Sequence, residues 1–320
     1  MVSSKAGAVR GRLVALLAAP AFVFMTAAAS GEVPEGLAPL VGTDPKVEKL
    51  AGALSFTEGP VWRAAQGDLL FSDIPASRIV RWFPGPDGPE LTTFRAPSGQ
   101  SNGLALDAQE RLLACEHGNR RVIRTEADGT VSALADRYEG KRLNSPNDLV
   151  VARDGSVYFT DPPYGVKEEE RELDFQGVFR VSADGKKLTL LVKDFVKPNG
   201  LAFSPDGKTL YIADTEKAHI RAFEVRKDGM LGKGRVFAPI PWPDGMKVDR
   251  AGNVWCPGGE GVSVFNGAGK LLGVVPVPEG PANCAFGGPD GKTLFITART
   301  GLYRVSVNVS GNLPSPAQGR

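Results

Sequence analysis

The chain repeats one short pattern six times, and this repeat limits the fold more than any other feature of the sequence. Each copy has a leading polar residue, a short apolar run, a polar turn and a second apolar run. The copies begin at Glu58, Asn102, Asn147, Asn199, Asp244 and Asn283. The leading residues are separated by 44, 45, 52, 45 and 39 positions. A period of about 45 residues with roughly four short strands is typical of a propeller blade. The repeat therefore predicts an all-β chain folded as a six-bladed β-propeller.

The turns between the apolar runs support this prediction. SPDGKTLY from Ser204 and GPDGKTLF from Gly288 place Pro, Asp and Gly where a tight β-turn needs them. Residues 47–54 precede the first repeat and have no partner in it. We expect them to pair with residues 302–307 of the last blade, which would close the ring.

The first thirty residues differ from the repeats. Lys5, Arg10 and Arg12 precede the apolar run LVALLAAPAFVFMTAAAS, which ends in small residues. This order predicts a signal peptide over residues 1–30, and therefore a periplasmic or secreted protein. The mature domain would span residues 31–320, with a flexible tail at 310–320 and no stable membrane association. An uncleaved anchor is the alternative, because the run approaches membrane-spanning length.

The amino-acid composition limits the kinds of partner that the protein is expected to bind. The formal net charge is +2 with both signs interspersed, which argues against a nucleic-acid partner. The three cysteines, Cys115, Cys256 and Cys284, form no CxxC motif and cannot all pair within one chain. The sequence therefore predicts a fold that depends on its hydrophobic core and has no disulfide framework.

The leading polar residues form a first column, which starts the strand expected to be innermost in each blade. A second column follows 14 or 15 residues later, at the end of the next strand. Its members are Asp73, Glu116, Asp161, Asp214, Gly258 and Ala298. In an antiparallel hairpin these two positions lie at the same end, so both columns should meet at one mouth of the central channel. The alternative is that such residues only hydrogen-bond local backbone, and it remains open for Asp73, Glu116 and Asp214.

A ring of amide and carboxylate oxygens suits a hard cation, and Ca²⁺ above all. The sequence therefore predicts a metal site in the central channel. His117 and His219 are the only histidines and belong to different blades, which disfavours zinc. Mg²⁺, Mn²⁺ and Zn²⁺ remain alternatives to Ca²⁺.

Four motifs make the chain resemble a known family. They are FTEGPVW from Phe56, NSPNDLVV from Asn144, PNGLAFSPDG from Pro198 and PDGMKVDRAGNVW from Pro243. Together they resemble the SMP-30/gluconolactonase/LRE family of six-bladed calcium propellers. CEHGNRRVIR from Cys115 and FTDPPYG from Phe159 are most similar to its bacterial gluconolactonase branch. The resemblance implies that the metal ligands are Glu58, Asn147, Asn199 and Asp244.

The resemblance also implies a reaction, the opening of a sugar lactone by water. The cation would polarise the lactone carbonyl, and Asp244 would accept the proton of the attacking water. His117, near the channel mouth, is the second candidate catalytic residue because it could donate to the carbonyl or to sugar hydroxyls. The predicted substrate contacts are Asn102, Asp161, Tyr164 and Asn283.

Two other functions remain open from the sequence. The same site could hydrolyse organophosphates or aryl esters, because neither fold nor metal fixes the substrate. The chain could also be an exported, non-catalytic propeller that binds a ligand and uses calcium structurally. A serine hydrolase is disfavoured, since the chain has no G-x-S-x-G motif.

Overall fold

The computed structural model describes residue 1 and residues 32–85 and 88–312. The described residues from 33 onward belong to one compact unit. Residues 2–31 lie outside the described part, so the signal peptide and its cleavage stay predictions. The flexible tail predicted for 310–320 is covered only as far as residue 312.

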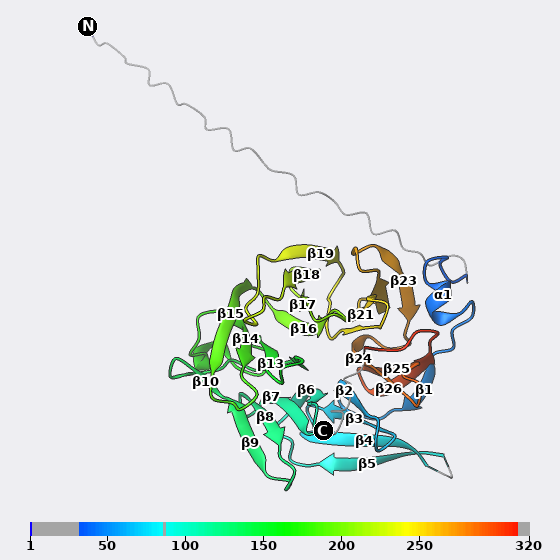
Figure 1. Cartoon of the computed structure of the whole chain (residues 1–320), viewed down its shortest axis with the longest axis horizontal. Coiled ribbons are helices and arrows are strands. Elements are labelled where there is room, and N and C mark those ends of the chain that lie inside the picture. The colour runs from blue at the N-terminus through cyan, green and yellow to red at the C-terminus, as the bar shows by residue number, and fades with distance from the viewer. Residues whose placement is uncertain (2–31, 86–87, 313–320) are drawn as a thin grey trace. The chain divides into compact units, whose positions relative to one another are not determined.

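Within the described residues, six four-stranded antiparallel sheets surround a central axis (Figure 1). From the centre outward, the first is β2 (Thr57–Arg63), β3 (Asp68–Asp73), β4 (Arg78–Gly85) and β5 (Gly88–Arg95). The second is β6 (Ser101–Leu106), β7 (Leu112–Glu116), β8 (Arg121–Thr125) and β9 (Val131–Ala135). The third is β12 (Leu149–Val151), β13 (Val157–Asp161), β14 (Gln176–Val181) and β15 (Leu188–Phe195). These sheets are blades 1 to 3.

Blades 4 to 6 follow the same pattern. The fourth is β16 (Pro198–Phe203), β17 (Thr209–Asp214), β18 (His219–Glu224) and β19 (Arg235–Pro239). The fifth is β20 (Lys247–Val248), β21 (Val254–Gly258), β22 (Gly261–Phe265) and β23 (Leu271–Pro276). The sixth is β24 (Pro281–Gly287), β25 (Thr293–Ala298), β26 (Gly301–Ser306) and β1 (Glu48–Ala51). The remaining elements are α1 (Ala38–Val41), the hairpin β10 (Arg137–Tyr138) and β11 (Lys141–Arg142), and the 3₁₀ turn η1 (Glu168–Glu170). The predicted six-bladed propeller is confirmed.

The ring closes where the sequence predicts. Strand β1 pairs antiparallel with β26, with Glu48 opposite Arg304 and Lys49 opposite Tyr303. The last blade therefore takes its outermost strand from the start of the domain. This pairing joins the two ends of the propeller and leaves neither blade 1 nor blade 6 at an open end of the ring.

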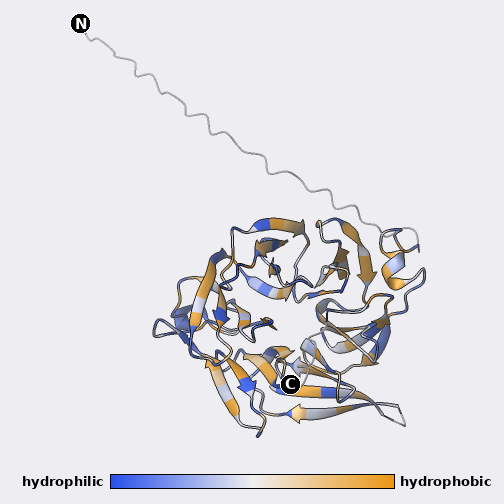
Figure 2. Ribbon diagram, in the orientation of Figure 1, coloured by the Kyte–Doolittle hydropathy of each residue, from blue (hydrophilic) through white to orange (hydrophobic). Residues whose placement is uncertain are grey.

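The core lies between the blades. Successive side chains of a strand point to opposite faces of its sheet. Along β3, Leu70 packs against blade 2, whereas Leu69 and Phe71 pack against blade 6. The described residues contain six such clusters, one at each interface between neighbouring blades. Figure 2 shows hydrophobic residues distributed over all six sheets.

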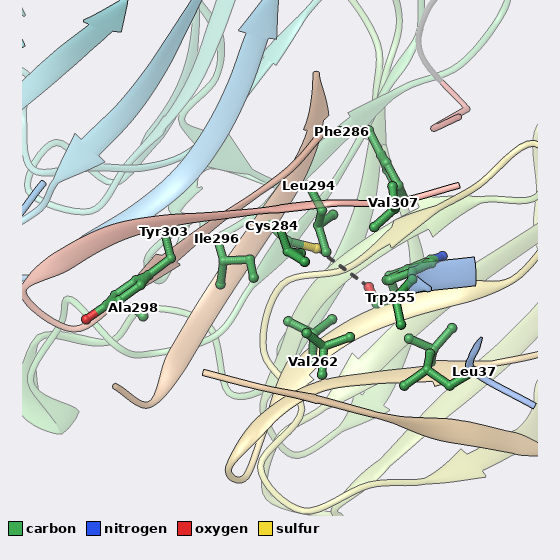
Figure 3. Close-up of a cluster of buried hydrophobic side chains, with 14 residues drawn as sticks. Leu37, Trp255, Val262, Cys284, Phe286, Leu294, Ile296, Ala298, Tyr303 and Val307 are labelled. Carbon is green, nitrogen blue, oxygen red and sulfur yellow. Dashed lines mark hydrogen bonds between the residues drawn. The ribbon is translucent and has the colours of Figure 1, made fainter. Parts of the chain in front are cut away.

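The interface of blades 5 and 6 illustrates this packing (Figure 3). Trp255 of β21, with no exposed surface, packs near Phe286 of β24, and the two ring centroids are 5.6 Å apart. Leu37, just before α1, belongs to the same buried cluster.

All three cysteines are free and buried. Among the described residues, no helix has the length and apolar character needed to cross a membrane.

Candidate active site

The first-column residues lie where predicted, at the start of the innermost strand of each blade. Glu58, Asn102, Asn199 and Asn283 lie within β2, β6, β16 and β24, while Asn147 and Asp244 come shortly before β12 and β20. Contacts between blades show that these positions meet. Asn283 Nδ2 donates to Glu58 Oε2 at 2.9 Å, although 225 residues separate the two in sequence.

Glycine lets neighbouring innermost strands approach each other. It directly follows four first-column residues, in the pairs Glu58-Gly59, Asn102-Gly103, Asn199-Gly200 and Asp244-Gly245. A Cβ on Gly200 would lie 2.3 Å from the carbonyl oxygen of Asp244, so no larger residue fits without a backbone shift. The Gly200 N–H instead donates to that oxygen at 3.1 Å. Gly103 N–H donates to Asn147 O at 2.9 Å in the same way. These two X-Gly pairs therefore join blade 2 to blade 3 and blade 4 to blade 5 around the mouth.

Three carboxyl groups converge at this mouth. Burial, reinforced by the charges of Asp244 and Asp148, holds the pKa of Glu58 well above its ordinary value. Burial and the charge of Asp148 likewise raise the pKa of Asp244 to about 7, against the hydrogen bonds from Asn199 and Glu58 and the charge of Arg299. Burial also raises the pKa of Asp148, and the positive charge of Lys247 opposes that rise. So much negative charge in a poorly solvated place favours a bound cation.

The neutral groups beside these acids also fit a hard cation. The Oδ1 atoms of Asn199 and Asn102 are buried and accept no hydrogen bond. An unpartnered buried acceptor is costly unless something else satisfies it, and a cation does so. Asn147 is held by its backbone, which donates to Thr160 O at 2.9 Å. Within the described residues, no group of three or more His, Cys, Asp or Glu side chains could hold a metal. A metal here would therefore need the amide oxygens as well as the carboxylates.

His117 faces the same mouth. It is 7% exposed, and its Nε2 lies 3.3 Å from Nδ2 of Asn102. Burial lowers the pKa of His117 to about 4, so the ring is neutral at physiological pH. A neutral imidazole can orient a hydroxyl group or accept a proton, but it has no positive charge with which to bind an anion. The structure thus pairs two of the predicted residues, His117 and Asn102.

Tyr164 lies in the loop after β13. Thr215 and Asn199 are close enough to its hydroxyl to lower its pKa. Burial raises the pKa of Tyr164 to about 12, so the phenol keeps its proton. The residue is nevertheless 43% exposed, which leaves part of the ring available to a ligand. The predicted substrate contact at Tyr164 is compatible with this position.

The second column has a structural role. Asp73 Oδ1 accepts from the N–H groups of Ser55 and Phe56, both at 3.1 Å, just before Glu58. Asp214 accepts from the N–H groups of Val196 and Lys197, both at 3.0 Å, just before Asn199. Asp161 Oδ2 accepts from Asn144 N–H at 2.8 Å, just before Asn147. Each carboxylate fastens the loop that carries one proposed ligand.

This arrangement changes the interpretation of two predicted substrate contacts. Asp161 is fully buried, and its loop-anchoring role accounts for its position better than contact with a substrate. Asn283 uses both ends of its amide within the protein. It donates to Glu58 and to Asp148 (3.4 Å), and accepts from Cys284 N–H at 2.9 Å and from Lys247 Nζ at 3.4 Å. The structure gives Asn283 the role of orienting Glu58.

Sequence reasoning missed Asp148 and Lys247 as members of the site. The sequence does contain a signal for both residues. Each is a charged residue directly beside the apolar residues of an innermost strand, in NDLVV and in GMKVD. It also missed the pocket that opens beside Asp244, which has a volume of about 200 Å³. Its walls include Phe56, Trp242 and Arg299, which flank column positions without belonging to them.

The chain is similar to several known proteins. Residues 56–300 match the family described as SMP-30/Gluconolactonase/LRE-like region. A gluconolactonase of Zymomonas mobilis is 32% identical over 297 residues, which cover 83% of this chain and 82% of the relative. Pentonolactonase XacC of Haloferax volcanii is 30% identical over 261 residues, covering 76% and 81%.

A solved structure extends this similarity to the fold. A gluconolactonase from Xanthomonas campestris is 40% identical and has a TM-score of 0.79, covering 86% of this chain and 93% of that one. These relatives share sequence, and in the solved case also fold, with more than three quarters of the chain.

Proposed function

Because this chain belongs to the SMP-30/gluconolactonase/LRE-like family, we propose that it is a metal-dependent lactonase that opens sugar lactones with water. One observation carries the proposal. The buried carboxyl group of Glu58 and the half-buried one of Asp244 lie with the unpartnered amide oxygen of Asn199 at the edge of a pocket. The relatives named above are a gluconolactonase and a pentonolactonase, so the substrate class is the cyclic ester of a sugar acid.

The proposed metal ligands are Glu58, Asn147, Asn199 and Asp244. Ca²⁺ is the proposed ion because carboxylate and amide oxygens are the ligands it prefers, and Mg²⁺, Mn²⁺ and Zn²⁺ are the alternatives. A divalent cation held there supplies a Lewis acid for the lactone carbonyl. Asn283 and the loop anchors Asp73, Asp161 and Asp214 keep the ligands in place.

Asp244 is the proposed general base. It lines the pocket, where a carboxylate can take a proton from a water molecule beside the lactone. Metal ligation lowers the basicity of a carboxylate. Asp244 is therefore suited to a reactive ester such as a lactone and poorly suited to an amide.

His117, Asn102 and Tyr164 are the proposed groups that orient the substrate. All three are uncharged at neutral pH, and all offer hydrogen-bonding atoms on one side of the mouth. Neutral donors and acceptors in this number suit the hydroxyl groups of a sugar lactone. They would hold the ring while its carbonyl faces Asp244.

The proposal is tested by proton release from a panel of lactones, with each of the four cations and with a chelator. We expect activity that a chelator abolishes and that one cation restores. Asp244→Asn should lower kcat by at least about 100-fold, because it removes the base and one ligand charge. Asp228→Asn, at an exposed turn, is the matched control and should keep full activity.

Other outcomes separate the alternative functions. Faster hydrolysis of organophosphates or aryl esters than of any lactone would move the assignment to that substrate class. No hydrolysis of any ester, with a melting temperature that falls on chelation, would indicate a structural metal and contradict the enzyme.

A further inference from the structure

The pocket beside Asp244 has a chemical character that the proposed reaction does not require. It lies where blades 5, 6 and 1 meet, since its walls come from the loops before β2, β20 and β24 and from the turns after β21 and β25. These wall residues are Phe56, Trp242, Asp244, Gly258, Gly259, Gly280, Pro281, Ala282 and Arg299. Two aromatic rings and one guanidinium thus stand next to a carboxylate.

Arg299 presents an available positive charge. It lies in the turn between β25 and β26, where its backbone O accepts from Thr57 N–H at 2.8 Å. Its side chain lies over Gly280, with Nε 3.4 Å from the point that a Cβ would occupy, and its Cζ is 5.9 Å from the centre of the Phe56 ring. In the part of the chain that the structure describes, no carboxylate lies within 4.0 Å of this guanidinium. The residue is exposed and lines the pocket, so its N–H donors are accessible to a ligand.

Trp242 presents an apolar surface to the same pocket. The residue is 72% exposed, and its backbone φ of 47° is one that large side chains rarely adopt. Gly258 makes room for this loop, since a Cβ there would lie 2.8 Å from Pro241 O and 3.0 Å from Trp242 O. A strained backbone that exposes a tryptophan beside a pocket suggests a ligand contact.

The two sides of the mouth differ in charge. His117, Asn102 and Tyr164, on blades 2 to 4, are uncharged, and Lys197 Nζ lies 5.9 Å from the centre of the Tyr164 ring. Arg299 lies on the side of blades 5, 6 and 1, together with the acids Glu58 and Asp244. The uncharged groups on blades 2 to 4 can hydrogen-bond with the hydroxyl groups of a sugar. The charge of Arg299 acts on Asp244 across the pocket, but the guanidinium has no ion-pair partner in direct contact, so it can form a charge-assisted hydrogen bond with an anion of the ligand.

We propose that this pocket binds an anionic group on the substrate, so that the preferred lactones carry a carboxylate or a phosphate. Arg299 pairs with the anion, and Trp242 packs against the apolar C–H face of the sugar chain. This inference rests on the proposed lactonase function and narrows its substrate class. The anion lies on the side of the lactone away from His117, Asn102 and Tyr164.

The test compares three lactones: neutral gluconolactone, glucarolactone with a free carboxylate, and phosphogluconolactone. Arg299→Gln should reduce kcat/KM for at least one anionic lactone about 10- to 100-fold more than for gluconolactone, mainly through KM. Arg299→Lys should recover part of the loss, because it keeps the charge without the forked geometry. Arg250→Gln, an exposed arginine in the β20–β21 turn, is the control and should change none of the three.

The outcomes distinguish the source of the anion. A loss confined to phosphogluconolactone identifies a phosphate, and a loss confined to glucarolactone identifies a carboxylate. Equal losses on neutral and anionic lactones, or no loss at all, would overturn the inference while leaving the lactonase intact.

A second measurement does not depend on turnover. Calorimetry of the wild type and Arg299→Gln with the products gluconate and glucarate should show that glucarate binding weakens more in the variant. If the wild type opens no lactone, the proposed function fails. The pocket inference then stands or falls on this binding difference alone.

Discussion

At the residue scale, the site depends on small residues placed beside polar ones. The glycine after Glu58, Asn102, Asn199 or Asp244 has no side chain to hold the neighbouring blade away. The polar residue therefore reaches the axis, and the N–H groups of Gly103, Gly200 and Gly245 donate to the next blade. Buried acids add a second constraint, because their charge must be met by hydrogen bonds or by a cation.

Gly200→Ala tests the close approach of blades 4 and 5. The new Cβ would lie 2.3 Å from Asp244 O, so the backbone carrying Asp244 must move. We expect the melting temperature to fall by about 5 °C or more, and cation affinity to weaken. Gly267→Ala is the control, because its nearest neighbour would be 3.7 Å away. Equal melting temperatures for the two variants would contradict the argument.

Asp161 gives a pH-dependent prediction. Burial raises the pKa of Asp161 to about 7 in the folded protein, while the unfolded chain has an ordinary value near 4. Between these values the folded state binds more protons than the unfolded state, so stability falls as the pH rises. The effect on unfolding free energy is at most about 4 kcal/mol.

Asp161→Asn removes this titration. The melting temperature of the variant relative to the wild type should therefore be higher at pH 8 than at pH 4.5. Thermal melts at both values measure it, with exposed Asp228→Asn as the control. A difference that stays the same at the two pH values would show that Asp161 does not titrate in this window.

At the element scale, each blade is a local unit, but blade 6 depends on a strand from the far end of the domain. Strand β1 reaches β26 across more than two hundred residues, and side chains fasten the pairing. Glu279 accepts from Lys49 Nζ, Thr300 N–H and Tyr303 Oη–H at 2.8, 2.9 and 2.6 Å. Burial opposes the ionised form, yet these hydrogen bonds lower the pKa of Glu279 to about 2.

Glu279→Gln should loosen this closure. The amide would replace one carboxylate oxygen with an NH₂ group that faces two donors, and we expect the melting temperature to fall by about 2–4 °C. Glu48→Gln, on β1 itself, is the control because its ion pair with Arg304 is solvent-exposed. Scanning calorimetry of both variants measures the two melting temperatures. A larger decrease for Glu48→Gln than for Glu279→Gln would contradict the role of Glu279 in closing the ring.

At the scale of the whole molecule, the proposed ligands come from four different blades. Glu58 belongs to blade 1, Asn147 to blade 3, Asn199 to blade 4 and Asp244 to blade 5. A cation at the axis therefore contacts most of the ring at once. It also offsets the mutual repulsion of the buried acids, so its binding energy adds to the stability of the folded state.

We expect a saturating divalent cation to raise the melting temperature by several degrees, as about 3 kcal/mol of linkage at a hundredfold excess over Kd implies. Glu58→Gln should abolish most of that rise, because it removes a ligand charge. Scanning calorimetry with chelator and with Ca²⁺ measures both. The same rise in Glu58→Gln as in the wild type would place the cation elsewhere.

The sequence by itself determined the number of blades, the closing strand and the six positions that reach the axis. These features follow from period and strand alternation, which are local properties that every copy repeats. The tertiary structure decided which polar groups act together. Asn283 meets Glu58 and Asp148 across 225 and 135 residues, and Arg299 comes to lie over Phe56.

No local pattern specifies such partners, because they depend on how neighbouring blades pack. The same holds for the second column. Strand register placed Asp73, Asp161 and Asp214 near the mouth, but only the backbone N–H groups ahead of each innermost strand made them loop anchors. The sequence repeat determines the position of a residue in its strand, and the packing between blades determines what its side chain contacts.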